Sequence, residues 1–302
     1  MAKAGLLFVG TDDGLVLFSN PNNIGRWLRI GQPFREKVVR AVWPHADNPL
    51  VVVAAVAGMG VQRSDDGGQS WQRALDVEAG AIVGARSASN RLYLSTADGA
   101  IYRSDDAGAT WASCAPGGWP ASSDTQLVVA AKDAETVYVG SSGGSVWVSH
   151  DGGSGWARFG DSLAAPVAAL SESFRPMEML LALAGGALYQ SDGTAWQALG
   201  LPEPAMQALA TLAGQAPVWL VAQAAGGIAR SDDGGATWTV ANIEGPSTAP
   251  IGVIVPVSYH IDTAFAGDSA GQLLTSGDRG RNWQLVKQNL APIRSIAAAR
   301  LI

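Results

Sequence analysis

Short apolar runs alternate with short polar segments rich in Gly, Asp and Ser along the whole chain. In one representative stretch the runs are QLVVAAK (126–132), TVYVGSS (136–142), SVWVSH (145–150) and GWARFG (155–160). Runs of Val, Ala and aromatic residues bounded by turn residues predict four antiparallel strands joined by tight turns. No segment has a sustained helical period with capping residues, so we expect little helix.

One polar segment recurs at regular intervals. Five copies share Ser-x-Asp-x-Gly-x-x-Trp: Ser64, Asp66, Gly68 and Trp71; Ser104, Asp106, Gly108 and Trp111; Ser149, Asp151, Gly153 and Trp156; Ser231, Asp233, Gly235 and Trp238; Ser276, Asp278, Gly280 and Trp283. Two further copies are degenerate. QSDGTAW (190–196) is shortened between Ser191 and Trp196, and FSNPNNIGRW (18–27) is lengthened between Ser19 and Trp27.

The spacing of these copies predicts the fold. The tryptophans of the seven copies stand at 27, 71, 111, 156, 196, 238 and 283, so successive gaps are 44, 40, 45, 40, 42 and 45 residues. A period in the low forties with strand-like content is typical of a propeller blade. We therefore expect an all-β chain that forms one domain over 1–302, a seven-bladed β-propeller with four antiparallel strands in each blade.

The register of the repeat predicts how the ring closes. The chain opens with GLLFVGTDD, which matches the second strand of a blade, and it ends with IRSIAAARLI (293–302), which matches a first strand. The C-terminal strand should therefore be the innermost strand of the blade whose other three strands are N-terminal. Such a closure leaves no free sheet edge between the first and last blades.

The recurring segment is interpreted as a structural turn. Ser and Asp side chains bond nearby backbone N–H groups, Gly supplies a positive φ, and the Trp can bury its ring between strands or blades. A calcium loop is the competing interpretation, but it needs alternating oxygen ligands. Counting from Asp65, positions 3 and 5 are Gly67 and Gln69, so the ligands are too few. We expect no metal and no cofactor.

The five complete copies resemble the Asp-box, also called the BNR repeat, and the resemblance covers essentially the whole chain. The repeat occurs in sialidases, oligoxyloglucan-type glycoside hydrolases, sortilin-like receptor domains and photosystem II assembly factors. It is specific for the repeat and not for a function. The resemblance implies that the box lies on the face opposite the usual functional site.

Enzymatic interpretations find little support in the residues. The resemblance to sialidases would imply an arginine triad, a Tyr–Glu pair and an early Phe/Tyr-Arg-Ile-Pro motif, whereas Phe174-Arg175-Pro176 lacks the Ile and stands mid-chain. The xyloglucan-type enzymes are similar in their seven-bladed Asp-box propellers but pair two of them around a cleft. Carboxylate candidates for one loop face are Asp12, Asp13, Asp98 and Asp268, which are more typical of hairpin turns.

Other catalytic patterns are also explained by the repeat. GSSGG (140–144) and GDSAG (267–271) match Gly-x-Ser-x-Gly, but that motif needs a strand-to-helix turn, so Ser142 and Ser269 are expected to be turn residues. His45, His150 and His260 lack metal-ligand spacing. Cys114 is the only cysteine, which excludes an intrachain disulfide and fits a reducing compartment.

The loops from each fourth strand to the next first strand, and from each second strand to the third, are expected to share one face of the ring. Two features of this loop face favour binding. The segment RWLRIGQPFREKVVR (26–40) concentrates Arg26, Arg29, Arg35, Lys37 and Arg40 in a chain of net charge −6, and ring closure should add Arg294. The loop ASCAPGGWPASSDTQ (112–126) carries Trp119 outside the repeat register. Clustered Arg and Trp are enriched at interaction hot spots. A solvated basic face and a Trp that plugs the channel mouth are the alternatives.

We therefore expect a non-catalytic binding or assembly scaffold whose partner-binding candidates are Arg35, Lys37, Arg40, Trp119 and Arg294. The partner should be a protein, with a glycan as the second option. The alternative is a glycoside hydrolase or glycan-binding lectin. The acidic net charge disfavours nucleic acid, and no apolar run is long enough to span a membrane. We expect a soluble, cytoplasmic monomer, or an extracytoplasmic one if an export signal has been removed.

Overall fold

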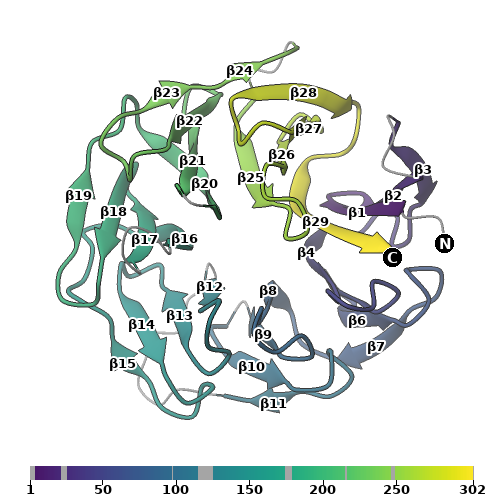
Figure 1. The fold of residues 1–302 in the computed structure, drawn as a ribbon. Coiled ribbons are helices and arrows are strands. Elements are labelled where there is room, and N and C mark those ends of the chain that lie inside the picture. The colour runs from purple at the N-terminus through teal and green to yellow at the C-terminus, as the bar shows by residue number, and fades with distance from the viewer. Residues whose placement is uncertain are drawn as a thin grey trace. The chain divides into compact units, whose positions relative to one another are not determined.

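The computed structural model consists of antiparallel sheets. It describes residues 4–21, 26–96, 98–114, 125–173, 179–214, 216–245 and 249–301, without the side chains of 205–207. Within these residues there is no helix, and the strands form seven sheets (Figure 1). Each sheet is a blade of four antiparallel strands. One of the blades has a fifth strand, which pairs in parallel with its outermost strand. The fold class is that of a seven-bladed β-propeller, as the repeat predicted.

The blades are numbered from the N-terminus, and each is given in its strand order. Blade 1 contains β29 (Ile293–Leu301), β1 (Ala4–Thr11), β2 (Gly14–Pro21) and β3 (Leu28–Gly31). Blade 2 contains β4 (Val39–Pro44), β5 (Val52–Val56), β6 (Gly60–Ser64) and β7 (Gln72–Leu75). Blade 3 contains β8 (Ala79–Gly84), β9 (Leu92–Thr96), β10 (Ile101–Ser104) and β11 (Ala112–Ser113).

The remaining blades follow the same plan. Blade 4 contains β12 (Gln126–Val129), β13 (Val137–Gly140), β14 (Val146–Ser149) and β15 (Ala157–Arg158). Blade 5 contains β16 (Val167–Ser173), β17 (Met179–Ala184), β18 (Ala187–Ser191) and β19 (Gln197–Leu199). Blade 6 contains β20 (Ala205–Leu212), β21 (Val218–Gln223), β22 (Ile228–Ser231) and β23 (Thr239–Val240). Blade 7 contains β25 (Ile251–Pro256), β26 (Ala264–Asp268), β27 (Leu273–Ser276) and β28 (Asn282–Lys287), with β24 (Asn242–Ile243) added beside β28.

The predicted pairing of the two ends of the chain is confirmed. The last strand, β29, lies beside β1 and completes the blade that β1, β2 and β3 begin. The pairing removes the edge that β1 would otherwise expose, since a strand at a sheet edge presents unpaired N–H and C=O groups.

Two compact units divide the chain. Unit 1 comprises Met1–Val139, Trp147–Ala157 and Arg294–Ile302, and unit 2 comprises Gly140–Val146 and Arg158–Ile293. Blade 1 to blade 3 lie in unit 1 apart from Ile293, and blade 5 to blade 7 lie in unit 2. The expectation of one domain over 1–302 stays a prediction.

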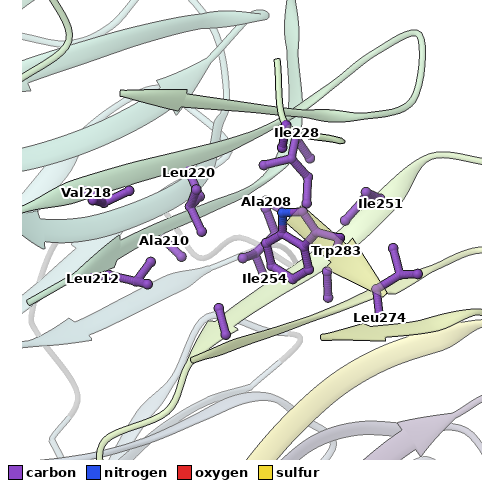
Figure 2. Close-up of a cluster of buried hydrophobic side chains, with 14 residues drawn as sticks. Ala208, Ala210, Leu212, Val218, Leu220, Ile228, Ile251, Ile254, Leu274 and Trp283 are labelled. Atoms are coloured by element: carbon purple, nitrogen blue, oxygen red, sulfur yellow. The ribbon is translucent and has the colours of Figure 1, made fainter. Parts of the chain in front are cut away.

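The second strand of a blade is buried on both faces, which explains why the sequence shows continuous apolar runs there. Every residue of β5, β9, β21 and β26 is buried. Apolar side chains of neighbouring blades then fill the space between the sheets. Figure 2 shows one such cluster in unit 2, where Trp283 packs with Leu220, Ile228 and Ile254. Trp283 is fully buried, so its large ring contributes much of the apolar burial in this cluster.

The first strand of most blades has a bulge near its beginning. The register between β4 and β5 shifts between Val39 and Ala41, which makes Arg40 the extra residue. Blades 3, 5 and 7 have the same shift, at Gly80, Ala168 and Gly252. A bulge can re-aim the side chain it carries. Among these four blades the bulge residue is thus charged only in blade 2, where it is Arg40, and is Gly or Ala in the other three.

Candidate functional site

The recurring segment is a hydrogen-bonded box in all five complete copies. The Ser hydroxyl donates to the Asp carboxylate at 2.8–2.9 Å and accepts the N–H of the Gly at 2.8–2.9 Å. The same Asp oxygen accepts the backbone N–H of the residue before the Trp at 2.7–2.9 Å. The Ser and Asp pairs are Ser64 with Asp66, Ser104 with Asp106, Ser149 with Asp151, Ser231 with Asp233 and Ser276 with Asp278. The turn therefore satisfies its own polar groups and leaves its carboxylates occupied.

The position before the Trp adds a second bond to the carboxylate in four boxes. The side chains of Ser70, Thr110, Thr237 and Asn282 each donate to the Asp at 2.5–2.6 Å. Gly155 occupies this position in the fourth blade and has no such donor. Hydrogen bonds to the charged form lower a carboxyl pKa. Those from Ser70 lower the pKa of Asp66 to about 2, and those from Thr237 lower the pKa of Asp233 to about 2.

The Trp of each box closes it from the other side, because its indole Nε1–H donates to the carbonyl oxygen of the box Gly at 3.1–3.2 Å. The bonded pairs are Trp71 with Gly68, Trp111 with Gly108, Trp156 with Gly153, Trp238 with Gly235 and Trp283 with Gly280. Except in blade 7, the fourth strand begins directly after this Trp, as β7 begins at Gln72.

The Gly of each box has a positive φ, between 81° for Gly280 and 93° for Gly153. A residue with a Cβ adopts such a backbone conformation only at a cost. Close packing is a second reason for the absence of a side chain. A Cβ on Gly108 would lie 2.7 Å from Cγ2 of Val53 in the preceding blade. The box therefore combines a turn that needs Gly with a close contact between blades.

The shortened copy keeps only part of this network. The N–H of Gly193 donates to the Ser191 hydroxyl at 3.0 Å, and Thr194 bonds Asp192 through both its N–H and its hydroxyl. Trp196 loses its carbonyl partner, and its buried Nε1 makes no hydrogen bond within the described residues. In the lengthened copy residues 22–25 lie outside the described residues.

An arginine that precedes the box links neighbouring blades, and our sequence reasoning did not single it out. Arg63, Arg103 and Arg230 each stand directly before a box Ser and donate to the backbone carbonyl of the next blade's box, at Ala107, Gly152 and Arg279, over 2.9–3.3 Å. Each also pairs with the Asp two residues later at 2.5–2.9 Å. The signal was present in the sequence as Arg-Ser-Asp-Asp, which occurs in three copies.

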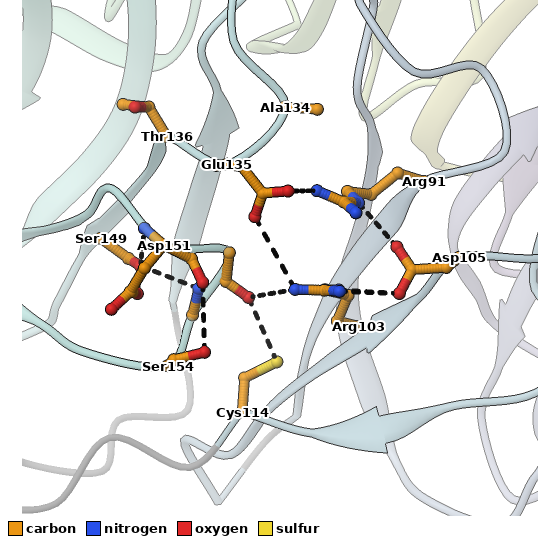
Figure 3. Close-up of polar contacts among 12 residues, drawn as sticks. Arg91, Arg103, Asp105, Cys114, Ala134, Glu135, Thr136, Ser149, Asp151 and Ser154 are labelled. Atoms are coloured by element: carbon orange, nitrogen blue, oxygen red, sulfur yellow. Dashed lines mark hydrogen bonds and ion pairs between the residues drawn. The ribbon is translucent and has the colours of Figure 1, made fainter.

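Between blades 3 and 4 this link widens into a four-residue ion network (Figure 3). Arg91 pairs with Glu135 and, at 2.6 Å, with Asp105, which also accepts from Arg103 at 2.9 Å. Although burial opposes the charge, the hydrogen bonds to Glu135 and Asp105 raise the pKa of Arg91. Two cations face two carboxylates, so the network is neutral, and all its groups are engaged in joining the blades.

Cys114 lies beside this network and is half-buried. Its sulfur is 3.7 Å from the carbonyl oxygen of Gly152, and burial raises the pKa of the thiol. A raised pKa disfavours the thiolate that nucleophilic chemistry needs. The thiol thus packs beside a blade-to-blade contact and lacks the environment of a reactive cysteine.

The loop from β3 to β4 is fastened to the hairpin between β1 and β2, and the two together form what we call the loop face of blade 1 (residues 11–14 and 32–37). The N–H of Gly14 donates to the carbonyl of Lys37 at 2.7 Å. The Asp13 carboxylate accepts the N–H of Glu36 at 2.7 Å and the amide of Gln32 at 3.1 Å. Asp13 therefore holds the loop in place.

The loop backbone is strained on both sides of Arg35. Phe34 has a φ of 60° and Glu36 a φ of 63°, values that residues with a Cβ adopt at a cost. Phe34 packs edge-on against Trp71, with ring centroids 5.0 Å apart. Arg35 and Lys37 are exposed and make no ion pair within the described residues. The loop therefore presents two unpaired cations on a backbone that its neighbours hold in an unfavourable conformation.

Arg40 and Arg294, the other two candidate arginines, lie beside the loop but have acidic partners. Arg40 is 3.4 Å from the Glu78 carboxylate, which also accepts the N–H of Gly58. Arg294 donates two hydrogen bonds to Asp12, at 2.7 and 2.6 Å. The structure thus brings Arg294 next to the loop through the Asp12–Asp13 hairpin, and the pairing with Asp12 offsets its charge. Trp119 lies outside the described residues.

The four carboxylates considered for catalysis are engaged in turns or ion pairs. Asp12 pairs with Arg294, and Asp13 holds the loop. The Thr96 hydroxyl donates to Asp98 and lowers its pKa, which is opposite to the raised pKa of a general acid. Asp268 is fully buried and accepts the N–H groups of Ala270 and Gln272 at 2.9 and 2.7 Å.

The remaining candidates have structural surroundings. Ser142 and Ser269 lie in the hairpins β13–β14 and β26–β27, where a strand follows and not a helix. His45 is buried and its ring bonds Asn90 at 2.8 Å and two backbone N–H groups. No cluster of three or more potential metal ligands occurs in the described part of the chain. Phe174, Arg175 and Pro176 lie outside it.

Comparison with known proteins agrees with this geometry. A family model of the BNR/Asp-box repeat matches residues 62–73, which contain the box of blade 2. The protein is a seven-bladed β-propeller with Asp-box repeats. No curated protein sequence matches the chain. The described residues also contain no helix long and apolar enough to cross a bilayer.

Several solved propeller structures share the fold of this Asp-box propeller. YCF48 from Cyanidioschyzon merolae is 14% identical with a TM-score of 0.64, over 86% of this chain and 88% of its own. A structure of YCF48 bound to D1 peptide is 15% identical with a TM-score of 0.60, over 82% and 80%. The GH74 xyloglucanase from Xanthomonas campestris is 18% identical with a TM-score of 0.68, over 94% of this chain and 53% of its own. This chain thus spans about half the length of that enzyme.

Proposed function

We propose that this Asp-box propeller is a non-catalytic scaffold that binds a protein partner through the loop face of blade 1. The observation that supports this most directly is the strained loop around Arg35, whose conformation Asp13 maintains. Strained backbone persists where the surrounding structure holds it and is found disproportionately at functional sites. Exposed arginine on such a loop matches the composition of interaction hot spots.

The four basic residues of the proposed site differ in how far neighbouring carboxylates offset their charge. Arg35 and Lys37 are the cations with no ion pair among the described residues, and Arg40 and Arg294 supply positive charge that Glu78 and Asp12 partly offset. A partner with acidic residues would meet Arg35 and Lys37 first, and its carboxylates could share Arg40 and Arg294 with their present partners. That a fold neighbour, YCF48, has been solved with a D1 peptide supports a peptide or protein as the class of partner.

The alternative, a glycoside hydrolase or glycan-binding lectin, rests on the likeness to the GH74 xyloglucanase. Inverting hydrolysis needs two carboxyl groups about 6.5–9.5 Å apart, with one acting as a general acid. In this chain Asp12, Asp13, Asp98 and Asp268 are each already engaged in an ion pair or a turn. The binding interpretation is therefore favoured.

Charge reversal of the two unpaired cations tests the proposal. Arg35→Glu/Lys37→Glu is compared with Arg86→Glu/Lys287→Glu, which makes the same change of charge at exposed residues of other blades. Arg40 and Arg294 are left intact, because reversing either would place two acidic groups together. Proteins captured from a lysate by the wild-type chain are identified and then tested with purified components.

We expect the purified partner to bind the wild type and the Arg86/Lys287 variant, and to lose at least about tenfold in affinity for the Arg35/Lys37 variant. Equal binding by all three proteins would contradict the proposed surface. Cleavage of xyloglucan or another glycan by the wild type would instead favour the enzymatic alternative.

A further inference from the structure

The outermost strand of blade 1 exposes two large hydrophobic side chains. Leu28 is 50% and Ile30 is 59% exposed, and both belong to β3, a strand of four residues. Four other large hydrophobic residues are exposed in the described part of the chain, and no two of them share a strand. Neighbouring exposed apolar side chains rimmed by polar groups are typical of surfaces that contact a protein or a membrane.

Two arginines accompany these hydrophobic residues. Arg26 and Arg29 are exposed and make no ion pair within the described residues. The stretch 14–35, which contains both β2 and β3, has no Asp or Glu. The chain as a whole has a net charge of −6, but carboxylates farther away than the Debye length, about 8 Å in physiological salt, are largely screened. The outer edge of blade 1 is therefore locally basic in an acidic chain.

Protection against unwanted strand pairing explains only part of this composition. β3 is the last strand of its sheet, and charged residues on an edge strand discourage pairing with other chains. The two arginines fit that role. Leu28 and Ile30 do not, because exposed apolar side chains on an edge favour association. Their position beside the arginines indicates a surface that both kinds of side chain contact together.

The exposure of successive residues indicates what kind of surface fits this edge. Leu28, Arg29 and Ile30 are consecutive and all exposed, although successive side chains of a strand point to opposite faces. Arg26 and Arg29 are three positions apart and so also lie on opposite faces. An extended protein segment on one face would meet only one of these arginines, whereas mobile lipids can surround the edge from both sides.

We propose that the residues Arg26, Leu28, Arg29 and Ile30, the basic edge of blade 1, bind the surface of an anionic lipid bilayer. Leu28 and Ile30 would enter the boundary between headgroups and acyl chains, and the guanidinium groups would contact the anionic headgroups. Binding of this kind increases with the apolar area buried and with the attraction of cations to anionic lipids. An arginine can also bury its aliphatic stem while its charged group stays among the headgroups.

This inference goes beyond the proposed function and does not depend on a protein partner. It assigns a second surface, on the outer edge of blade 1, to a different kind of partner. The test of the proposed function reverses Arg35 and Lys37, whereas the basic edge is tested without changing them. Either proposal can therefore fail while the other holds.

Sedimentation of the full chain with lipid vesicles tests the proposal. Unilamellar vesicles of phosphatidylcholine with about one-third phosphatidylserine are compared with vesicles of phosphatidylcholine alone, each at low and at high salt. Arg26→Glu/Arg29→Glu reverses the cations of the basic edge, and Leu28→Ser/Ile30→Ser removes its apolar side chains. All four side chains are exposed, so thermal unfolding of both variants should match that of the wild type.

Two matched controls make the same chemical changes elsewhere. Arg86→Glu/Lys287→Glu reverses two exposed cations of other blades. Leu50→Ser/Val240→Ser removes two exposed hydrophobic side chains of other blades, which are 42% and 66% exposed. These controls separate a contact at the basic edge from a general effect of net charge or of surface polarity.

We expect the wild type to bind the phosphatidylserine vesicles, to bind them more weakly at high salt, and not to bind phosphatidylcholine alone. Each basic residue near an anionic membrane contributes roughly fivefold in affinity. Arg26→Glu/Arg29→Glu should therefore weaken binding by at least about tenfold. Leu28→Ser/Ile30→Ser should weaken it by at least about threefold, and both controls should stay within about twofold of the wild type.

A fluorophore reports whether the apolar side chains enter the bilayer. Cys114 is the only cysteine, so Cys114→Ala provides a background for labelling. An environment-sensitive label attached through Ile30→Cys should shift to shorter wavelength with phosphatidylserine vesicles. The same label attached through Val240→Cys should keep its spectrum. Equal spectra of the two labelled proteins with vesicles would contradict insertion at the basic edge.

Several outcomes of the vesicle test would overturn the proposal. These are absence of binding at about millimolar lipid, equal binding to both kinds of vesicle, and equal losses in the test and control variants. Loss of vesicle binding with Arg35→Glu/Lys37→Glu alone would move the contact to the loop face. Retention of the wild type by immobilised polyglutamate, without binding to vesicles, would assign the edge to an acidic protein.

Discussion

The guanidinium of Arg294 lies against the carboxylate of Asp12, with Nε 2.7 Å and the terminal nitrogen 2.6 Å from the two oxygens. The two residues are 282 positions apart in the sequence, and their pairing ties the last strand of the chain to its first hairpin. The hydrogen bonds to Asp12 raise the pKa of Arg294, so this guanidinium stays charged at any ordinary pH.

The contribution of this pair to stability should be small. Arg294 is 52% exposed, and exposed pairs contribute about 0.2–1 kcal/mol. We expect a double-mutant cycle of Asp12→Asn and Arg294→Gln, measured by chemical denaturation, to give a coupling free energy in that range that decreases with added salt. A coupling free energy above about 2 kcal/mol would mean that the pair also stabilises the loop of residues 32–37, because Asp13, the neighbour of Asp12, bonds that loop.

The Ser of the box should contribute more, because its hydroxyl is buried and bonded twice. Ser104 donates to Asp106 and accepts from the N–H of Gly108. Ser104→Ala leaves that N–H unsatisfied, which costs about 1–3 kcal/mol of the free energy of unfolding. Ser87→Ala, at an exposed position, is the matched control and should change stability by less than about 0.5 kcal/mol. Equal effects of the two substitutions would contradict a structural role for the box.

The box of blade 4 can be improved. Gly155 takes the position at which Thr110 and Thr237 donate to the box Asp. We expect Gly155→Thr to stabilise the protein by about 0.5–1.5 kcal/mol, from the added hydrogen bond and the reduced freedom of the unfolded chain. A Cβ there would lie 3.0 Å from an Asp151 oxygen, which must shift by a few tenths of an ångström. Gly152→Thr should instead destabilise, because Gly152 has a φ of +69°. Thermal or urea unfolding of both variants distinguishes these outcomes.

The arginine before the box should not be replaceable by lysine. Arg230 is 6% exposed, donates from Nε to the Arg279 carbonyl at 2.9 Å and pairs with Asp232 through another nitrogen at 2.9 Å. Lysine can place its single ammonium at one of these acceptors only. We expect Arg230→Lys to lower the free energy of unfolding by about 1–2 kcal/mol. Arg73→Lys in an exposed pair of blade 2 is the control, and a loss of equal size there would contradict a special role for the blade-to-blade bond.

The boxes should make the fold sensitive to acid. The pKa of Asp66 and that of Asp233 are lowered to about 2 by their hydrogen bonds, from 3.8 in the unfolded chain. A lowered pKa in the folded state contributes stability that is fully present above pH 3.8 and is lost as the pH falls towards 2. Unfolding followed between about pH 5 and pH 2 should show this loss. Asp66→Asn/Asp233→Asn should make the dependence on pH shallower in that window, and an unchanged slope would contradict the assignment.

The sequence by itself determined the fold class and the strand order. The Trp spacing predicted seven blades, and the register of the first and last segments predicted the pairing of β29 with β1. Both follow from local chemistry, since each box must satisfy its own backbone groups and each second strand must be buried on both faces. The same reasoning identified Ser142 and Ser269 as hairpin residues.

Only the tertiary structure decided which charges remain available. The basic residues of 26–40 and Arg294 look equivalent in the sequence, but Arg294 and Arg40 meet Asp12 and Glu78, whereas Arg26, Arg29, Arg35 and Lys37 meet no carboxylate in the described chain. The blade-to-blade arginines and the parallel strand β24 were likewise not predicted. The repeat pattern predicts the contacts that form within each blade. Ion pairing and edge pairing join residues from different repeats, so the recurrence of Arg-Ser-Asp-Asp in three copies marks the arginine without showing which residue of another blade it bonds.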